Sequence, residues 1–319
     1  MRDEVVTKNY NKFDISASVG KDSVCLFDDY CTYDFEFLNI LAPSNITVTN
    51  IQDYGVDGLL GLGRSEPFKT GQLKDSNFPR GNSLVEKMVD DNLIPESIFS
   101  IALEQGENNK GKVVFGLPPQ QEMKDPESLI YISLVDDLFW GTYTTGFAFG
   151  FINNDFRVPS DANIPAHDGQ VYTIFDSDSE TIRMPKHIFS TYMDALYAEG
   201  SIGDARDVKP AGVTVKCVSE YPQLHFLLDR TWLTVQAEDY VTVLGNGNCL
   251  IKIAEGDAPF MVLGTPLYKG YMAIHDDKNG RLGFAPSKAS KKTGPYWGST
   301  PGNDFADYVA PAPVEKQEQ

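Results

Sequence analysis

Residues 172–185, with the sequence Tyr-Thr-Ile-Phe-Asp-Ser-Asp-Ser-Glu-Thr-Ile-Arg-Met-Pro, decide how the rest of the chain is interpreted. An apolar run ends at Asp176, small hydroxyl residues follow it, and a second apolar run ends at Pro185. Short apolar runs that turn residues bound are typical of buried β-strands. The stretch therefore predicts a strand that delivers a carboxylate into a turn, followed by an apolar step to Pro185 and a helix.

The remainder of the chain has the pattern of a β-rich protein. Glycine (27 residues) and proline (19 residues) are frequent among 319 residues, and many short apolar runs end at Gly, Pro, Asn or Asp. Helical periodicity is limited to Ser83–Asp91 and Lys186–Ala198. Strand-like runs are frequent, and examples are residues 45–51, 112–115, 129–134, 171–175, 232–235, 240–244, 260–263 and 271–275. We therefore predict an all-β body that carries a few single helices.

The charge balance excludes several classes of partner. The chain has 27 Lys and Arg residues against 45 Asp and Glu residues, which gives a formal net charge of −18. Binding to nucleic acid requires a basic surface that displaces counterions from phosphates, and anionic membranes attract basic segments. No uncharged apolar run approaches the roughly 18 residues that span a bilayer. We expect no nucleic-acid partner and no membrane span, and hydrophobic content of 41% is sufficient for a folded core.

The four cysteines fall into two pairs along the sequence. Cys25 and Cys31 are six residues apart, and Cys217 and Cys249 are 32 residues apart. An even count with this spacing predicts two disulfides and an oxidising compartment. The alternative is four buried thiols in a cytosolic protein. Residues 1–6 contain no apolar run, so the chain as written has no secretory signal peptide, which conflicts with the disulfide prediction.

The stretch around Asp176 resembles the second catalytic turn of the pepsin-like aspartic proteases. In that family a strand delivers an Asp in an Asp-Thr/Ser-Gly-Thr/Ser turn. Asp176, Ser177 and Ser179 match the first, second and fourth positions, and Asp178 replaces the Gly. Further resemblances follow in the family's order at residues 54–63, 93–100, 111–116, 140, 262–264, 271 and 281–286. Cys217 and Cys249 fall where the C-terminal lobe of the family usually has a disulfide.

The resemblance covers residues 10–286 and implies a bilobal, all-β, pepsin-like acid protease fold. We expect a partial N-terminal lobe at residues 1–125, a C-terminal lobe at residues 126–286 and a disordered tail at residues 287–319. In the family, two carboxylates share one proton, one of them activates a water molecule, and the peptide bond is hydrolysed in acid without any cofactor. Family members are secretory, vacuolar or lysosomal.

A weak internal repeat locates where the first catalytic turn would fall. Apolar residues run directly into Gly61 and into Gly264, where a glycine allows a second backbone to approach closely. Asp176 precedes Gly264 by 88 residues, and the same distance before Gly61 falls before residue 1. Residues 1–60 contain no Asp-Thr/Ser-Gly, and Tyr10 aligns with the flap tyrosine of the family. We therefore expect an incomplete N-terminal lobe that lacks the first catalytic turn and the signal segment, which removes the conflict over the disulfides.

The resemblance implies a small set of site residues. Asp176 is the surviving catalytic carboxylate, and Tyr10, Ser177 and Ser179 are the substrate-binding residues. Asp178 adds a negative charge, and it stands where Gly would adopt its backbone angles freely. A metal site at Asp176, Asp178 and Glu180 is an alternative, but Thr181 and His187 break the EF-hand spacing, so we predict no metal. The four scattered histidines are predicted to be surface or satisfied residues.

Three functions are compatible with these residues. The first is a degenerate homologue of the aspartic endopeptidases that binds peptide or protein and does not cleave it. The second is an active endopeptidase that obtains its second Asp from an upstream segment, a separate chain or a dimer. The third is a structural subunit whose partner chain covers the incomplete lobe, because an open lobe leaves strand edges and apolar surface exposed.

Overall fold

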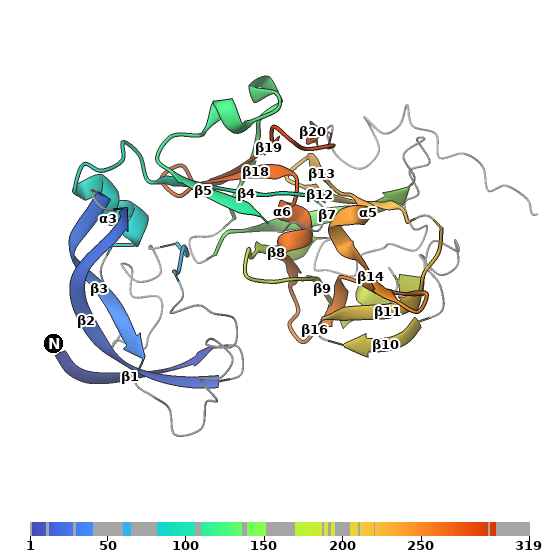
Figure 1. Cartoon of the computed structure of the whole chain (residues 1–319), viewed down its shortest axis with the longest axis horizontal. Coiled ribbons are helices and arrows are strands. Elements are labelled where there is room, and N and C mark those ends of the chain that lie inside the picture. Colours follow the sequence, from blue (N-terminus) through green and yellow to red (C-terminus); the bar gives the residue numbers. More distant parts are fainter. Residues whose placement is uncertain are drawn as a thin grey trace, which may run out of the picture. The chain divides into compact units, whose positions relative to one another are not determined.

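The computed structural model describes residues 2–10, 13–27, 30–40, 60–64, 82–105, 110–135, 139–150, 170–186, 188–190, 193–194, 205–209, 211–219, 221–292 and 294–297. Strands predominate in these ranges, which confirms the all-β class (Figure 1). The chain divides into two compact units, residues 1–98 with 115–117, and residues 99–114 with 118–319. No helix in the described ranges is long and apolar enough to cross a membrane.

The first unit contains a three-stranded antiparallel sheet in the order β1-β2-β3. Its strands are β1 (Arg2–Tyr10), β2 (Phe13–Phe27) and β3 (Tyr30–Ile40). Cys25 in β2 lies directly opposite Cys31 in β3, and the two form a disulfide across the hairpin. The first predicted disulfide is thereby confirmed, and it fixes the register of the hairpin near its turn.

The first unit also contains the predicted helix after residue 83, which is α3 (Leu84–Asp90). Ser83 caps it, because its hydroxyl oxygen accepts from the amide of Glu86 while the Glu86 carboxylate accepts from the amide of Ser83. Leu84 and Met88, one helical turn apart, are buried together with Val85. The helix therefore forms where the capping box and the apolar stripe both predict it.

The second unit is built on an eight-stranded sheet in the order β16-β9-β17-β8-β7-β12-β13-β20. Most of its strands are short, and β13 is buried along its whole length. The strands are β7 (Gly141–Gly150), β8 (Val171–Phe175), β9 (Ile182–Pro185), β12 (Gln223–Leu228), β13 (Thr231–Val235), β16 (Ile253–Gly256), β17 (Met261–Leu263) and β20 (Tyr296–Trp297).

Two further sheets complete the described architecture. A four-stranded sheet has the order β10-β11-β15-β14, with β10 (Ala205–Lys209), β11 (Gly212–Lys216), β15 (Asn248–Ile251) and β14 (Val241–Gly245). A five-stranded sheet has the order β5-β4-β18-β19-β6, with β5 (Gly111–Phe115), β4 (Ile98–Leu103), β18 (Tyr271–Asp276), β19 (Arg281–Pro286) and β6 (Ile130–Ser133). Cys217 and Cys249 form the second predicted disulfide, which joins the end of β11 to β15.

Short helical segments link the strands of the second unit. They are the α-helices α5 (Ala237–Tyr240) and α6 (Thr265–Tyr268) and the 3₁₀ turns η1 (Gln120–Glu122) and η2 (Pro126–Ser128). The described part of the predicted helix Lys186–Ala198 is helical, at residues 186, 188–190 and 193–194. The sequence pattern predicted the helix at Lys186–Ala198 but not α5, α6, η1 or η2, which are too short to show helical periodicity.

The strand predictions agree closely with the observed elements. Seven of the eight predicted ranges coincide with β5, β6, β8, β13, β14, β17 and β18, and the range 45–51 lies outside the described residues. The lobe boundaries stay predictions. Within the predicted disordered tail, residues 287–292 and 294–297 have defined positions, because they bond to the body of the second unit. Residues 298–319 lie outside the described ranges.

Candidate functional site

Three strands position the turn that carries Asp176. β8 leads into the turn and β9 leads out of it, and both are found in Figure 1. β17 lies between them, parallel to β8 and antiparallel to β9, so that Leu263 pairs with Phe175 and Val262 pairs with Arg183. The two strands that flank the turn are therefore not neighbours. This arrangement fixes Asp176 at the carboxyl end of β8, where the alternating burial of that strand ends.

The backbone of the turn orients the Asp176 carboxylate. The amide of Asp176 donates to the carbonyl of Leu263 at 3.1 Å, which continues the pairing with β17. The amide of Ser179 donates to the carbonyl of Asp176 at 3.2 Å, and the amide of Asp178 donates to Oδ1 of Asp176 at 3.0 Å. The last bond is an Asx turn, in which a carboxylate accepts from the amide two residues further along. The carboxylate is therefore held by its own turn.

Asp178 does not adopt the positive φ angle that a glycine could adopt at this position. The described non-glycine residues with positive φ are Asp34, Asn92, Asp229, Arg230 and Asn246, and Asp178 is not among them. An L-residue can occupy this position without strain, because its amide closes the Asx turn at negative φ. The replacement of Gly by Asp178 therefore requires no left-handed backbone angle. What the replacement changes is the charge that stands beside Asp176.

The two serines of the turn have different surroundings. Ser177 is exposed, whereas Ser179 is buried. The hydroxyl of Ser179 donates to the carbonyl of Thr181 at 3.0 Å, and the carbonyl of Ser179 accepts from the amide of Thr265 at 2.7 Å. Ser179 therefore fastens the turn to the start of α6. Tyr10, the fourth predicted site residue, lies at the end of β1 in the first unit, where it pairs with Phe13.

Gly264 is the point at which two backbones approach most closely beside the turn. A Cβ atom at this position would lie 2.2 Å from the carbonyl oxygen of Ser179 and 2.4 Å from that of Thr181. The close approach predicted from the repeat is therefore confirmed at Gly264. At Gly61 no such approach appears among the described residues, since a Cβ atom there meets nothing within 4 Å.

A buried tyrosine and a buried histidine lie close to the turn, and no sequence pattern had indicated that they meet there. The hydroxyl of Tyr268 is 3.3 Å from Nε2 of His275, and the His275 ring stacks on Phe99 with centroids 4.3 Å apart. Burial raises the pKa of Tyr268, and the negative charge of Asp176 raises it further. Burial lowers the pKa of His275 to about 3. Both side chains are therefore neutral near pH 7.

A second histidine is also buried and bonded. Nδ1 of His225 lies 3.0 Å from Oγ1 of Thr234, and burial lowers the pKa of His225 to about 3. His225 and His275 are thus core residues, and each has one ring nitrogen within hydrogen-bond distance of a hydroxyl group. His167 and His187 lie outside the described residues. In the described ranges, no group of three or more His, Cys, Asp or Glu side chains is placed to hold a metal ion.

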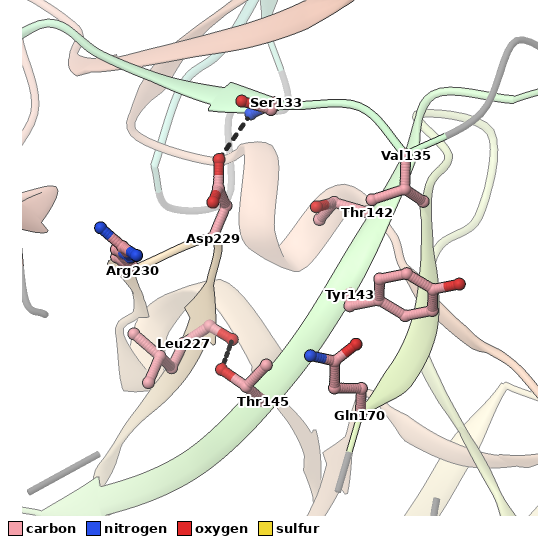
Figure 2. A pocket seen from close by; sticks show the side chains of 9 residues that line it. All are labelled: Ser133, Val135, Thr142, Tyr143, Thr145, Gln170, Leu227, Asp229 and Arg230. Atoms are coloured by element: carbon pink, nitrogen blue, oxygen red, sulfur yellow. Dashed lines mark hydrogen bonds between the residues drawn. The ribbon is translucent and has the colours of Figure 1, made fainter. Parts of the chain in front are cut away.

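A pocket of about 290 Å³ lies elsewhere in the second unit (Figure 2). Five of its nine lining residues carry a hydroxyl or amide side chain, but most of its wall is apolar, and the predicted site residues do not line it. Figure 2 shows that Asp229 accepts from the amide of Ser133, at 2.9 Å, and that the Thr145 hydroxyl donates to the carbonyl of Leu227. These two polar groups are engaged within the fold. Because none of the predicted site residues lines it, the pocket is separate from the carboxylate turn.

Comparisons with known proteins agree with this arrangement. The family model described as eukaryotic aspartyl protease matches residues 6–287. Gastricsin of Mus musculus is 23% identical over 248 residues, which cover 75% of this chain and 56% of gastricsin. Aspartic protease 6 of Caenorhabditis elegans is 24% identical over 237 residues (72% and 54%), and an acid protease of Saccharomycopsis fibuligera is 23% identical over 244 residues (74% and 58%). The chain spans about half the length of the curated relatives it matches.

Proposed function

Because the chain belongs to the eukaryotic aspartyl protease family, we propose that its Asp176 turn binds extended peptide or protein segments and that this chain alone does not hydrolyse them. One observation carries the proposal. The 319 residues contain no Asp-Thr/Ser-Gly, and the related turn at Asp176 has an Asp in place of the Gly. The chain as given therefore offers one catalytic-type carboxylate.

Hydrolysis by this family's route needs two carboxylates that share a proton. When two carboxyl groups lie a hydrogen bond apart, like-charge repulsion prevents both from ionising. One then accepts a proton from the attacking water, and the other donates a hydrogen bond to the peptide carbonyl. In the observed turn, the Asp176 carboxylate instead accepts a hydrogen bond from the backbone amide of Asp178. A lone carboxylate can accept a peptide N–H but cannot fill both roles.

The turn keeps features that suit peptide binding. Asp176 is partly exposed and is already oriented by the Asx turn, so little conformational entropy is lost when it accepts a hydrogen bond. Ser177 is exposed beside it and offers a hydroxyl that can donate or accept. Gly264 and Ser179 hold the turn against β17 and α6. These contacts support a rigid, preformed acceptor for backbone amides.

We expect a fluorescently labelled, reduced and alkylated polypeptide to bind this chain saturably at pH 5 while its mass stays unchanged. Asp176→Asn should weaken binding by about tenfold or more, because a hydrogen bond to a charged group contributes roughly 1.5–3 kcal/mol. Fluorescence anisotropy measures the affinity, and mass spectrometry checks the polypeptide afterwards. Glu180→Gln is the matched control, since Glu180 is an exposed acid four residues away and should change the affinity less than about twofold. Absence of saturable binding by the unmodified chain would reject the proposal.

An active endopeptidase is the second candidate, and the coverage of the relatives favours it. Two of the four relatives are named as proteases. The chain covers only 51–58% of the relatives' lengths, so a longer natural chain or a second chain could supply the other Asp. In that form, acid-dependent cleavage should appear and Asp176→Asn should abolish it. If the longest natural chain binds polypeptide but leaves it intact, this candidate is excluded.

A further inference from the structure

The second unit continues past the part of the chain that matches the family. The match ends at residue 287, yet residues 287–292 and 294–297, here named the C-terminal strap, have defined contacts. The amide of Ser287 donates to the carbonyl of Gly270 at 2.9 Å, and that of Lys288 donates to the carbonyl of Glu122 at 2.8 Å. The strap ends in β20, which pairs antiparallel with β13 (Figure 1). An addition to the family domain is thus built into its sheet.

Lys292 places a charge in the interior at the middle of the strap. Its Nζ atom lies 3.2 Å from Oδ2 of Asp239, and both side chains are 0% exposed. Nζ also donates to the carbonyl of Leu267 at 3.4 Å and lies 4.1 Å from the centre of the Tyr271 ring. Burial lowers the pKa of Lys292, and Asp239 opposes that change. A buried ammonium without a counter-charge is strongly unfavourable, so docking of the strap depends on Asp239.

The acceptor for Lys292 is held in place by residues outside the strap. Oδ2 of Asp239 accepts from the amide of Gln236 at 3.0 Å, which caps the start of α5. Nε2 of Gln105 donates to Oδ1 of Asp239 at 3.2 Å and to Oε1 of Gln236 at 2.7 Å. Asp239 is therefore oriented by two neighbours that lie far from Lys292 in the sequence. This preorganisation lets one ammonium complete the network.

The backbone of the strap is bound by the same network. Oε1 of Gln105 accepts from the amide of Lys291 at 2.8 Å and from the hydroxyl of Ser290 at 3.3 Å. Nζ of Lys124 donates to the carbonyl of Ser290 at 3.1 Å and to that of Lys292 at 3.4 Å. These bonds form while the strap has the position in which Lys292 reaches Asp239. Release of Lys292 would therefore disturb them together.

The neighbouring lysine provides an internal comparison. Nζ of Lys291 lies 2.7 Å from Oε2 of Glu238, but the two side chains are 72% and 33% exposed. Exposed ion pairs contribute little, because solvent screens them and long side chains lose entropy. Buried pairs behave differently, because removal of one partner leaves the other charge buried with neither a counter-charge nor solvent. Two adjacent lysines of the strap thus form ion pairs that differ sharply in burial.

We propose that the Lys292–Asp239 ion pair is a lock that fastens the C-terminal strap to the second unit and keeps β20 on β13. Without β20, β13 ends the described sheet and presents the unpaired backbone groups that proteins normally cover. The strap therefore serves as a built-in edge cover whose position depends on one charge pair. This inference does not rest on the proposed function.

Hydrogen exchange of the full chain, read by mass spectrometry, tests the lock. Lys292→Met should accelerate exchange of the amides of residues 288–297 by more than about a hundredfold, because breaking a buried pair is strongly destabilising. Lys291→Met, the same change at the exposed neighbour, should alter them by less than about threefold. Exchange in β8 and β18 should stay as in the unmodified chain. The double variant Lys292→Met with Asp239→Asn keeps an oxygen acceptor at the cap and removes the stranded charge, so it should recover part of the protection.

Three results would overturn the lock. The first is strap exchange in Lys292→Met that equals that of Lys291→Met. The second is a loss of protection in Lys292→Met that extends equally through β8 and β18. The third needs no variant and applies even if Lys292→Met fails to fold. In the unmodified chain, strap amides should exchange nearly as slowly as those of β18, and exchange at the rate of a frayed terminus would contradict the proposal.

Discussion

Gly264→Ala is expected to destabilise the second unit by about 3 kcal/mol or more. The added Cβ atom would lie 2.2 Å from the carbonyl oxygen of Ser179 and 2.4 Å from that of Thr181. Both atoms belong to backbone that hydrogen bonds hold, so a side-chain rotation cannot relieve the overlap. The turn must move away from β17, which also displaces Asp176. Urea unfolding followed by far-ultraviolet circular dichroism measures the loss.

The matched control for this variant is Gly256→Ala in β16, a strand of the same sheet. A Cβ atom at Gly256 would have its nearest contact at 3.4 Å, to the carbonyl oxygen of Met184, so the stability should change by less than about 1 kcal/mol. Equal stability losses for the two variants would mean that the close approach at Gly264 is not what holds the turn. In that case the confirmed spacing around Gly264 would have no special role in presenting Asp176.

Lowering the pH from 7 to 4.5 is expected to destabilise the protein by on the order of 5 kcal/mol through His225 and His275 together. Burial lowers the pKa of each to about 3, below the ordinary value of 6.5. Between these values the unfolded chain binds more protons than the folded one, so stability falls as pH falls below 6.5. Each histidine contributes about 1.4 kcal/mol per pH unit in this range.

Urea unfolding across this pH range, repeated with two variants, separates the contributions. His275→Phe keeps a ring against Phe99, and His225→Asn keeps a polar group near Thr234. Each variant should remove about half of the pH dependence between pH 6.5 and 4.5, even if it lowers the stability at pH 7. A dependence that neither variant reduces would show that other groups titrate on unfolding in this range.

The parts of the fold that the sequence predicted are those fixed by local pattern. β8 is a short apolar run directly before Asp176. The helix α3 has its N-cap at Ser83 and buries Leu84 and Met88, which lie one turn apart. The cysteines of each pair are close enough in sequence for count and spacing to indicate their partners. Gly264 was identified because a glycine after an apolar pair often marks close backbone approach.

What the sequence could not predict depends on contacts between distant segments. Lys292 stands in a polar, proline-rich tail, so its pattern indicated a solvated extension. It is buried beside Asp239 of α5, and Gln105, far away in the sequence, donates a hydrogen bond that orients Asp239. His275 lies within the buried strand β18, and its partner Tyr268 comes from the separate helix α6. The negative charge of Asp178 follows from the sequence alone. The φ angle of Asp178 depends on the Asx turn that its amide closes.

Incubation of this chain with an unfolded polypeptide between pH 3 and pH 6 tests the central claim most directly. Mass spectrometry detects new termini, and Asp176→Asn prepared in parallel controls for contaminating protease. We predict that neither protein produces cleavage above the background of the polypeptide alone, because this chain as given supplies a single catalytic-type carboxylate. Acid-dependent cleavage by the unmodified chain that Asp176→Asn abolishes would contradict the account.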